Sequence, residues 1–139
     1  MNIQKRIFAS VIVVLVATLA GSQSAPESFD SFYSRFKNAV AQKDEAALQK
    51  MMTPRFDFLI TPNVSPSTAF NAMDDDNGQL WTNLQTAIQQ GSPSSQAYGG
   101  KPSRLLWCTP SEVIYNCYVV FQKDKSNAWR WRAFVMPQK

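Results

Sequence analysis

"AWRWRAFVM", residues 128–136, is the stretch that decides the fold, because large apolar side chains alternate there with basic ones. Successive side chains of a β-strand point to opposite faces, so this alternation predicts a strand. The strand would have two different faces, with Trp129, Trp131, Ala133 and Val135 on one and Arg130, Arg132, Phe134 and Met136 on the other.

A hairpin turn at residues 125–127 (KSN) would join this strand to the preceding apolar run, residues 113–122. An even-length loop would put both arginines beside apolar side chains, so the hydrophobic pattern favours an odd-length loop. The odd register pairs apolar residues with one another: Phe121 with Trp131, Val119 with Ala133 and Cys117 with Val135. We therefore expect the tryptophan face to lie in the core.

The opposite face of this hairpin carries Tyr118, Arg130 and Arg132. Two arginines and a tyrosine form either a solvated sheet surface or the wall of a pocket that accepts an anion. The pattern favours the solvated surface, because a strand alternates in this way without any partner. These three residues are nevertheless the ligand-binding candidates of the chain.

Two helices are predicted upstream of the sheet. Apolar residues recur at helical spacing through residues 29–40, behind a capping box at residues 24–27. Asp44 is a good N-cap for a second, shorter helix, which should stop at Thr53-Pro54.

Residues 55–60 (RFDFLI) predict a strand with Phe56, Phe58 and Ile60 on one face. A helix over residues 80–90 should end at Gly91. Residues 92–103 have the composition of a polar loop, and a further strand is expected over residues 104–108.

The acidic run Asp74–Asp76 invites comparison with a calcium-binding loop. With Gly78 at position 6 of such a loop, positions 1 and 12 are Met73 and Leu84, which cannot supply oxygen ligands. We therefore expect no metal here, and interpret the run as the capped start of the helix over residues 80–90.

The N-terminal residues predict export. Lys5 and Arg6 precede an apolar run, residues 7–20, which is short for a membrane span and typical of a signal peptide. We favour cleavage after Ala20, with alternatives up to residue 25, and the competing interpretation is an uncleaved anchor. The expected organisation is a signal peptide over residues 1–20 and one α+β domain over residues 21–139, periplasmic or extracellular, without a stable membrane anchor.

The mature charge is small, because twelve of the fourteen basic residues and all ten acidic ones follow the leader, giving 12 − 10 = +2. This balance gives no support for a nucleic-acid partner.

Cys108 and Cys117 are the only cysteines. In an exported protein an even count indicates a disulfide, the alternative being two separate buried thiols.

Residues 29–52 (FDSFYSRFKNAVAQKDEAALQKMM), "RFDFLI" and "AWRWRAFVM" together resemble the nuclear transport factor 2-like superfamily, which includes SnoaL-like proteins and has a cystatin-like α+β fold. The resemblance covers residues 27–139. It implies N-terminal helices packed on a curved, mostly antiparallel sheet, with a cone-shaped cavity.

Members of that superfamily include cavity enzymes and non-catalytic binding domains, so two functions follow from the resemblance. One is an exported, non-catalytic domain that binds a small molecule, peptide or envelope component in a cavity or on the open sheet face. The other is an isomerase or cyclase with Asp57 as general base and Tyr115 or Tyr118 as hydrogen-bond donor. The chain has no histidine, and no cofactor is expected. The oligomeric state stays open, with a homodimer as one candidate.

Overall fold

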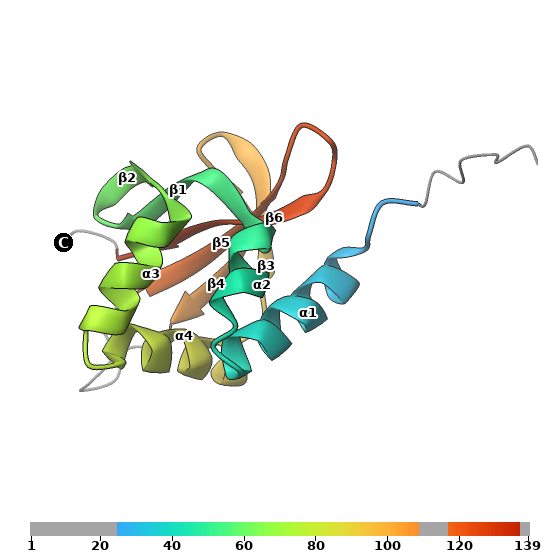
Figure 1. The fold of residues 1–139 in the computed structure, drawn as a ribbon. Helices are drawn as coiled ribbons and strands as arrows, with labels where there is room; N and C mark the ends of the chain where they lie inside the picture. The colour runs from blue at the N-terminus through green and yellow to red at the C-terminus, as the bar shows by residue number, and fades with distance from the viewer. Residues whose placement is uncertain (1–24, 109–116, 137–139) are drawn as a thin grey trace, which may run out of the picture.

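The computed structural model describes residues 25–108 and 117–136, so the predicted signal peptide over residues 1–20 lies outside the described residues. Within these residues four helices and six strands follow one another (Figure 1): α1 (Phe29–Ala41), α2 (Glu45–Met51), β1 (Met52–Leu59), β2 (Thr61–Val64), α3 (Pro66–Asp75), α4 (Gln79–Gln90), β3 (Ser94–Tyr98), β4 (Lys101–Cys108), β5 (Cys117–Lys123) and β6 (Trp129–Val135).

The first two helices follow the sequence pattern, with one correction at the start. The N-cap of α1 is Ser28, whose hydroxyl accepts the N–H of Ser31 at 3.2 Å, so the capping box predicted at residues 24–27 is wrong. Glu27 instead accepts two hydrogen bonds from Arg35, at 2.7 and 2.6 Å. The N-cap of α2 is Asp44, as predicted, and its carboxylate accepts the N–H of Ala47 at 3.0 Å.

Helix α3 was not predicted. Pro66 occupies its first turn, where the missing N–H of proline is harmless, and Ser65 is the N-cap. The acidic run Asp74–Asp76 ends α3, so the prediction that it caps α4 is wrong. The N-cap of α4 is Gly78, in a left-handed conformation and without a side-chain cap.

The sheet has six strands in the order β2-β1-β6-β5-β4-β3. Strands β1 and β6 are parallel, and the other neighbours are antiparallel, so the fold is α+β with a mixed, mostly antiparallel sheet. The sheet is open, with β2 and β3 at its edges. Strand β3 lies within residues 92–103, which the sequence pattern assigned to a loop, and β2 lies in a segment for which no element was predicted.

Helices α1 to α4 pack on one face of the sheet (Figure 1). Aromatic side chains fill the space between the helices and the sheet. Trp131 is fully buried, and its ring contacts those of Phe36 and Phe56, with centroids 5.1 and 4.9 Å apart. Phe121 lies opposite Trp131, as predicted, and contacts Phe36 at 4.9 Å. The prediction that Trp131 faces the core is confirmed.

The predicted register between β5 and β6 fails beyond this pair. A bulge follows, so Val119 pairs with Phe134 rather than Ala133. Phe134 therefore joins the core, while Ala133 lies on the opposite face with Val120 and Leu105. Val135 pairs with Tyr118 on that opposite face, not with Cys117. The extra residue of a bulge reverses which side chains of β6 face the core beyond that point, and a strict alternation of faces along the sequence cannot predict this.

Strand β1 confirms the predicted burial of Phe56 and Phe58 but not that of Ile60, which is 66% exposed. Leu59 has a positive φ of 53°, which ends the alternation one residue early. The strand also begins earlier than predicted and includes Thr53 and Pro54.

The Cys108–Cys117 disulfide is present between β4 and β5, with a Cα–Cα distance of 4.9 Å.

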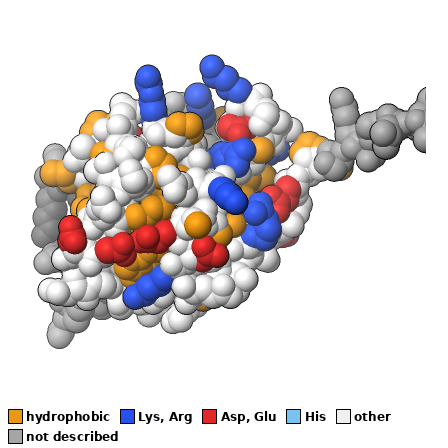
Figure 2. Space-filling view, in the orientation of Figure 1, with side chains coloured by type: hydrophobic (Ala, Val, Ile, Leu, Met, Phe, Trp, Pro, Cys, Tyr) orange, Lys and Arg blue, Asp and Glu red, His pale blue; other side chains and the backbone are white. Residues whose placement is uncertain are grey.

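In residues 25–108 and 117–136, no helix is long and apolar enough to cross a bilayer. Figure 2 shows basic, acidic and apolar side chains together on the visible surface of the molecule.

Candidate functional site

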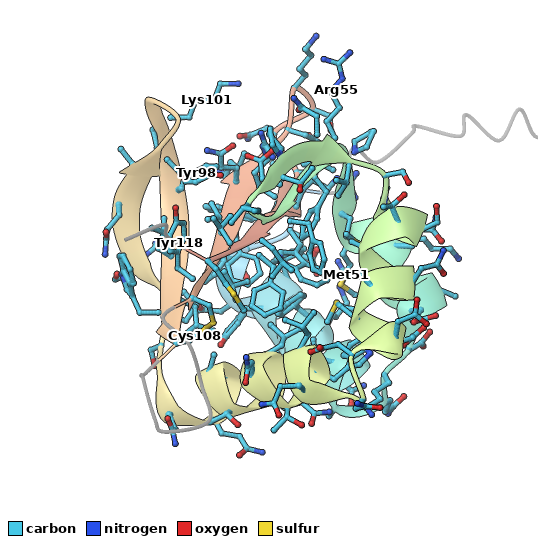
Figure 3. All side chains as sticks on the ribbon, turned by 90° about the vertical axis from the view of Figure 1, so that its left-hand side faces the viewer. Met51, Arg55, Tyr98, Lys101, Cys108 and Tyr118 are labelled. Carbon is cyan, nitrogen blue, oxygen red and sulfur yellow. A yellow bond between two sulfur atoms is a disulfide. The ribbon has the colours of Figure 1, made fainter. Side chains whose placement is uncertain are left out.

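The sheet face opposite the helices, here called the open face, carries a row of aromatic side chains. Trp107 on β4 contacts Tyr118 on β5, with ring centroids 5.1 Å apart, and Tyr118 contacts Tyr98 on β3 at 6.2 Å. Trp107 is 50% exposed, and both tyrosines are half-buried. We call these three residues the aromatic strip; Figure 3 shows its two tyrosines on the same side of the sheet.

The tip of the β3–β4 hairpin folds over the open face. Gly99 and Gly100 form this tip, both with positive φ, a conformation that glycine adopts without strain. The amide of Gln122, on β5, donates to the carbonyl of Tyr98 at 2.8 Å, although β4 separates their strands. The hairpin therefore reaches across its neighbour.

This curvature brings the two ends of the sheet together. Strands β1 and β3 are second and sixth in the sheet, so 6 − 2 = 4 strand spacings separate them. That would be about 19 Å in a flat sheet. Yet the hydroxyl of Tyr98 donates to Oδ2 of Asp57 at 2.8 Å. The Tyr98–Asp57 hydrogen bond therefore ties the hairpin tip to β1.

Asp57 is held from three directions. In addition to Tyr98, the backbone N–H of Asn63 donates to its Oδ1 at 3.1 Å, and Nη1 of Arg132 lies 3.2 Å from its Oδ2. The same Arg132 nitrogen donates to the carbonyl of Arg55 at 3.3 Å. The Asp57 cluster, meaning Asp57, Tyr98 and Arg132, thus joins three strands of the sheet.

Burial and hydrogen bonding oppose each other in setting the pKa of Asp57. Burial by itself raises it, but the hydrogen bonds from Tyr98, Asn63 and Arg132 together outweigh burial, so the pKa of Asp57 is lowered. The pKa of Tyr98 is raised, first by burial and then by its bond to the Asp57 carboxylate. At neutral pH the cluster therefore consists of a carboxylate, a neutral phenol and a guanidinium.

Two hollows meet at the Tyr98–Asp57 hydrogen bond. One has a volume of about 340 Å³ and is called the apolar hollow after five of its side chains, Leu59, Ile60, Pro62, Val135 and Met136; Thr61 and Tyr118 line it as well. The other, the polar hollow, has a volume of about 420 Å³ and is lined by Asp57, Tyr98, Gly99, Lys101, Gln122 and Arg132. Asp57 and Tyr98 line both hollows.

The predicted site residues do not all lie together. Tyr118 and Arg132 lie on the open face, where the sequence pattern placed them, and both are near Asp57, although the pattern did not bring Arg132 to Asp57. Arg130 instead pairs with Asp124 at 2.9 Å and donates to the carbonyl of Lys50 at 3.0 Å. Arg130 therefore stabilises the β5–β6 turn and connects it to the end of α2. Tyr115 lies outside the described residues.

Sequence reasoning missed Tyr98, Trp107 and Lys101. Tyr98 and Lys101 flank Gly99-Gly100, a two-residue glycine turn that signals a hairpin. That signal was present in the segment interpreted as a loop. The contact between Tyr98 and Asp57 spans 41 residues of sequence and depends on how the sheet curves, which local patterns do not encode.

The arrangement suits binding better than proton abstraction. A general base working near neutral pH requires a raised pKa, whereas that of Asp57 is lowered and both of its oxygens accept hydrogen bonds.

Among the described residues no three His, Cys, Asp or Glu side chains are placed to hold a metal ion. Comparison with protein-family models, curated proteins and solved structures finds no match to this chain.

Proposed function

We propose that the chain is an exported, non-catalytic domain that binds a small amphiphilic molecule on the open face of its sheet. One observation carries this proposal: a partly exposed aromatic strip lies beside an apolar and a polar hollow that share Asp57 and Tyr98 as a common wall. Apolar walls with a few convergent polar groups are the usual composition of small-molecule sites.

The two hollows define the chemistry of the ligand. Its apolar body would lie against Tyr118 and Val135 in the apolar hollow and extend along the strip towards Trp107. Its polar head would take hydrogen bonds in the polar hollow from Lys101, because the amide of Gln122 already donates to the carbonyl of Tyr98 and the hydroxyl of Ser103. Each volume lies within the usual range for small ligands, roughly 300–1,000 Å³.

Export is part of the proposal and has two supports. The basic start and short apolar run of residues 5–20 have the pattern of a signal peptide. The Cys108–Cys117 bond is of the kind that persists in oxidising compartments such as the periplasm or the extracellular space.

We also propose that the fold is nuclear transport factor 2-like. The element order supports this assignment, because two helices precede a strand pair, two further helices, and four closing strands. The likeness of residues 29–52 to that superfamily is the second support. The space between helices and sheet is filled by aromatic side chains such as Phe36 and Trp131, so we locate the ligand on the open face.

The experiment is native mass spectrometry of the protein isolated, without detergent, from the exported fraction of its native cells. We expect a small molecule bound to the wild type and lost from Trp107→Ser and Tyr118→Ser. The matched control is Ile88→Ser, which changes a partly buried apolar residue in the helix layer. A wild type that carries no small molecule, or an equal loss in the control, would overturn the proposal.

A further inference from the structure

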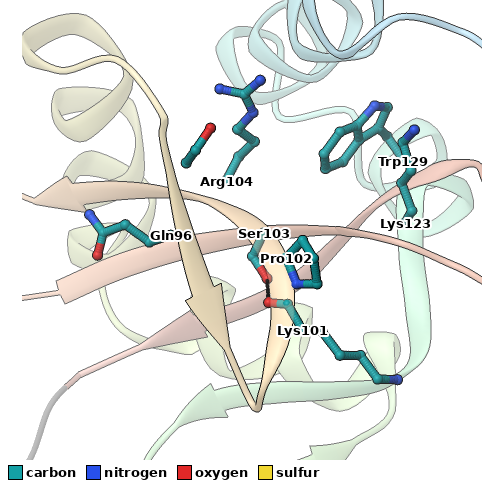
Figure 4. A pocket seen from close by; sticks show the side chains of 8 residues that line it. Gln96, Lys101, Pro102, Ser103, Arg104, Lys123 and Trp129 are labelled. Atoms are coloured by element: carbon teal, nitrogen blue, oxygen red, sulfur yellow. Dashed lines mark hydrogen bonds between the residues drawn. The ribbon is translucent and has the colours of Figure 1, made fainter.

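A third hollow, of about 660 Å³, lies on the helix side of the sheet near the start of α1 (Figure 4). Arg104, on β4, pairs with Phe121, whose side chain packs against α1, and this pairing identifies the face. The hollow lies apart from the aromatic strip, although Lys101 lines both this hollow and the polar hollow of the open face. Its main lining residues are Ser95, Gln96, Lys101, Arg104, Lys123 and Trp129.

Two of the three cations that line this hollow, Arg104 and Lys123, lie over aromatic rings. The guanidinium of Arg104 lies over the ring of Phe29, 5.3 Å from its centroid, and the ammonium of Lys123 lies 5.3 Å from the ring of Trp129. A cation over an aromatic face is attracted by the ring quadrupole and keeps its full charge. Both groups are therefore positioned without being neutralised.

Three other arginines of the described residues are paired with carboxylates. Arg35 pairs with Glu27, Arg130 with Asp124, and Arg132 with Asp57. Within the described residues, by contrast, no carboxylate pairs with Arg104 or Lys123, and no acidic residue lines the hollow. The positive charge here is thus left available to a ligand.

We infer that this hollow binds a small aromatic anion, a planar ring bearing a phosphate, sulfonate or carboxylate. The anionic group would accept charge-assisted hydrogen bonds from Arg104 and Lys123, whose donors suit such oxygens. The planar ring would pack against the indole of Trp129, which is partly exposed. The hydroxyl of Ser95 supplies a further donor at the edge strand β3.

Phenyl phosphate is the probe, and the indole N–H signals of the folded protein, recorded by two-dimensional NMR, are the readout. Trp129 lines this hollow, Trp107 lies on the open face, and Trp81 and Trp131 are buried in the core. We expect a saturable shift of the Trp129 signal alone. Phenol and inorganic phosphate should each bind at least tenfold more weakly, since each lacks one half of the recognised structure.

Two variants test the assigned cations separately. Arg104→Gln and Lys123→Gln should each weaken phenyl phosphate binding by roughly tenfold, an order of magnitude in Kd. The matched control is Lys37→Gln, because Lys37 is also held over an aromatic ring, that of Tyr33 at 4.9 Å, but lies outside this hollow. Its affinity should change less than twofold.

The inference is overturned if phenyl phosphate shifts no signal, or if it shifts Trp107 instead of Trp129. It is also overturned if Lys37→Gln weakens binding as much as Arg104→Gln and Lys123→Gln do, because binding would then follow net charge alone. None of these outcomes depends on whether the open face binds an amphiphile.

Discussion

Removing the hydroxyl of Tyr98 tests whether the Asp57 cluster holds the curvature of the sheet. Tyr98→Phe deletes one hydrogen bond of 2.8 Å from a neutral donor to an ionised carboxylate. Hydrogen bonds to charged groups contribute about 1.5–3 kcal/mol. The Asp57 side chain is 18% exposed, so water can replace part of the lost bond. We therefore expect the free energy of unfolding to fall by about 1.5 kcal/mol.

Urea unfolding followed by circular dichroism measures this change, with Tyr118→Phe as the matched control. Tyr118 is a half-buried tyrosine on the same face, with no hydrogen bond to a carboxylate of the described residues. Its substitution should change stability by less than about 0.5 kcal/mol. In an Asp57→Ala background the effect of Tyr98→Phe should largely disappear, because the two side chains act through one bond.

The effect of Tyr98→Phe should also depend on pH. The pKa of Asp57 is lower in the folded than in the unfolded chain, so the unfolded state binds more protons as the pH falls through about 4. The stability contributed by the cluster is therefore present above the unfolded pKa and lost as the pH falls through the folded pKa. A loss no larger than that of Tyr118→Phe at neutral pH would refute this account of the cluster.

Three other predictions follow from the core, a buried phenol and the disulfide. Trp131→Ala should lower the free energy of unfolding by about 3–5 kcal/mol, because the side chain is fully buried among aromatic rings. Arg132→Ala should lower it by only about 1–2 kcal/mol, through the loss of the bonds from Arg132 to Asp57 and Arg55. Equal losses in urea melts would contradict the assigned faces of β6. Burial raises the pKa of Tyr33 to about 12, and its hydroxyl has no hydrogen-bond partner. Tyr33→Phe should therefore stabilise the fold by up to about 1 kcal/mol. Because the pKa of Tyr33 is higher in the folded than in the unfolded chain, the wild type should lose stability between about pH 10 and 12, and Tyr33→Phe should remove this loss. An absorbance titration with no late-ionising tyrosine would refute the assignment. Replacing both Cys108 and Cys117 with serine should lower stability by about 2–3 kcal/mol in thermal melts, and an unchanged stability would contradict a contribution from the disulfide.

Sequence patterns predicted the parts of this fold that depend on neighbouring residues. Helical spacing located α1, and Asp44 correctly marked the start of α2. The pairing of Phe121 with Trp131 followed from hydrophobic alternation and a turn at residues 125–127. In each case the residues that decide the structure lie within a few positions of one another, or on strands joined by a short turn.

The parts that sequence did not predict depend on irregular backbone or distant contacts. The bulge in the β5–β6 pair moved Phe134 into the core and Ala133 onto the open face. Helix α3 was not predicted, because a proline such as Pro66 can either end a strand or begin a helix. The bond between Tyr98 and Asp57 required the curvature of the whole sheet. Of the site, only Asp57, Tyr118 and Arg132 could therefore be named in advance.

The most direct test of the proposed binding face is a titration with n-octyl-β-glucoside below its micellar concentration, followed through the indole N–H signals. This probe is a neutral amphiphile, so it does not test the cationic hollow at Arg104. Trp107 is the half-exposed tryptophan of the aromatic strip, whereas Trp81 and Trp131 are buried. The proposal predicts a saturable shift of the Trp107 signal that Tyr118→Ser abolishes. A Trp107 signal that does not move, or that moves equally in Tyr118→Ser, would contradict it.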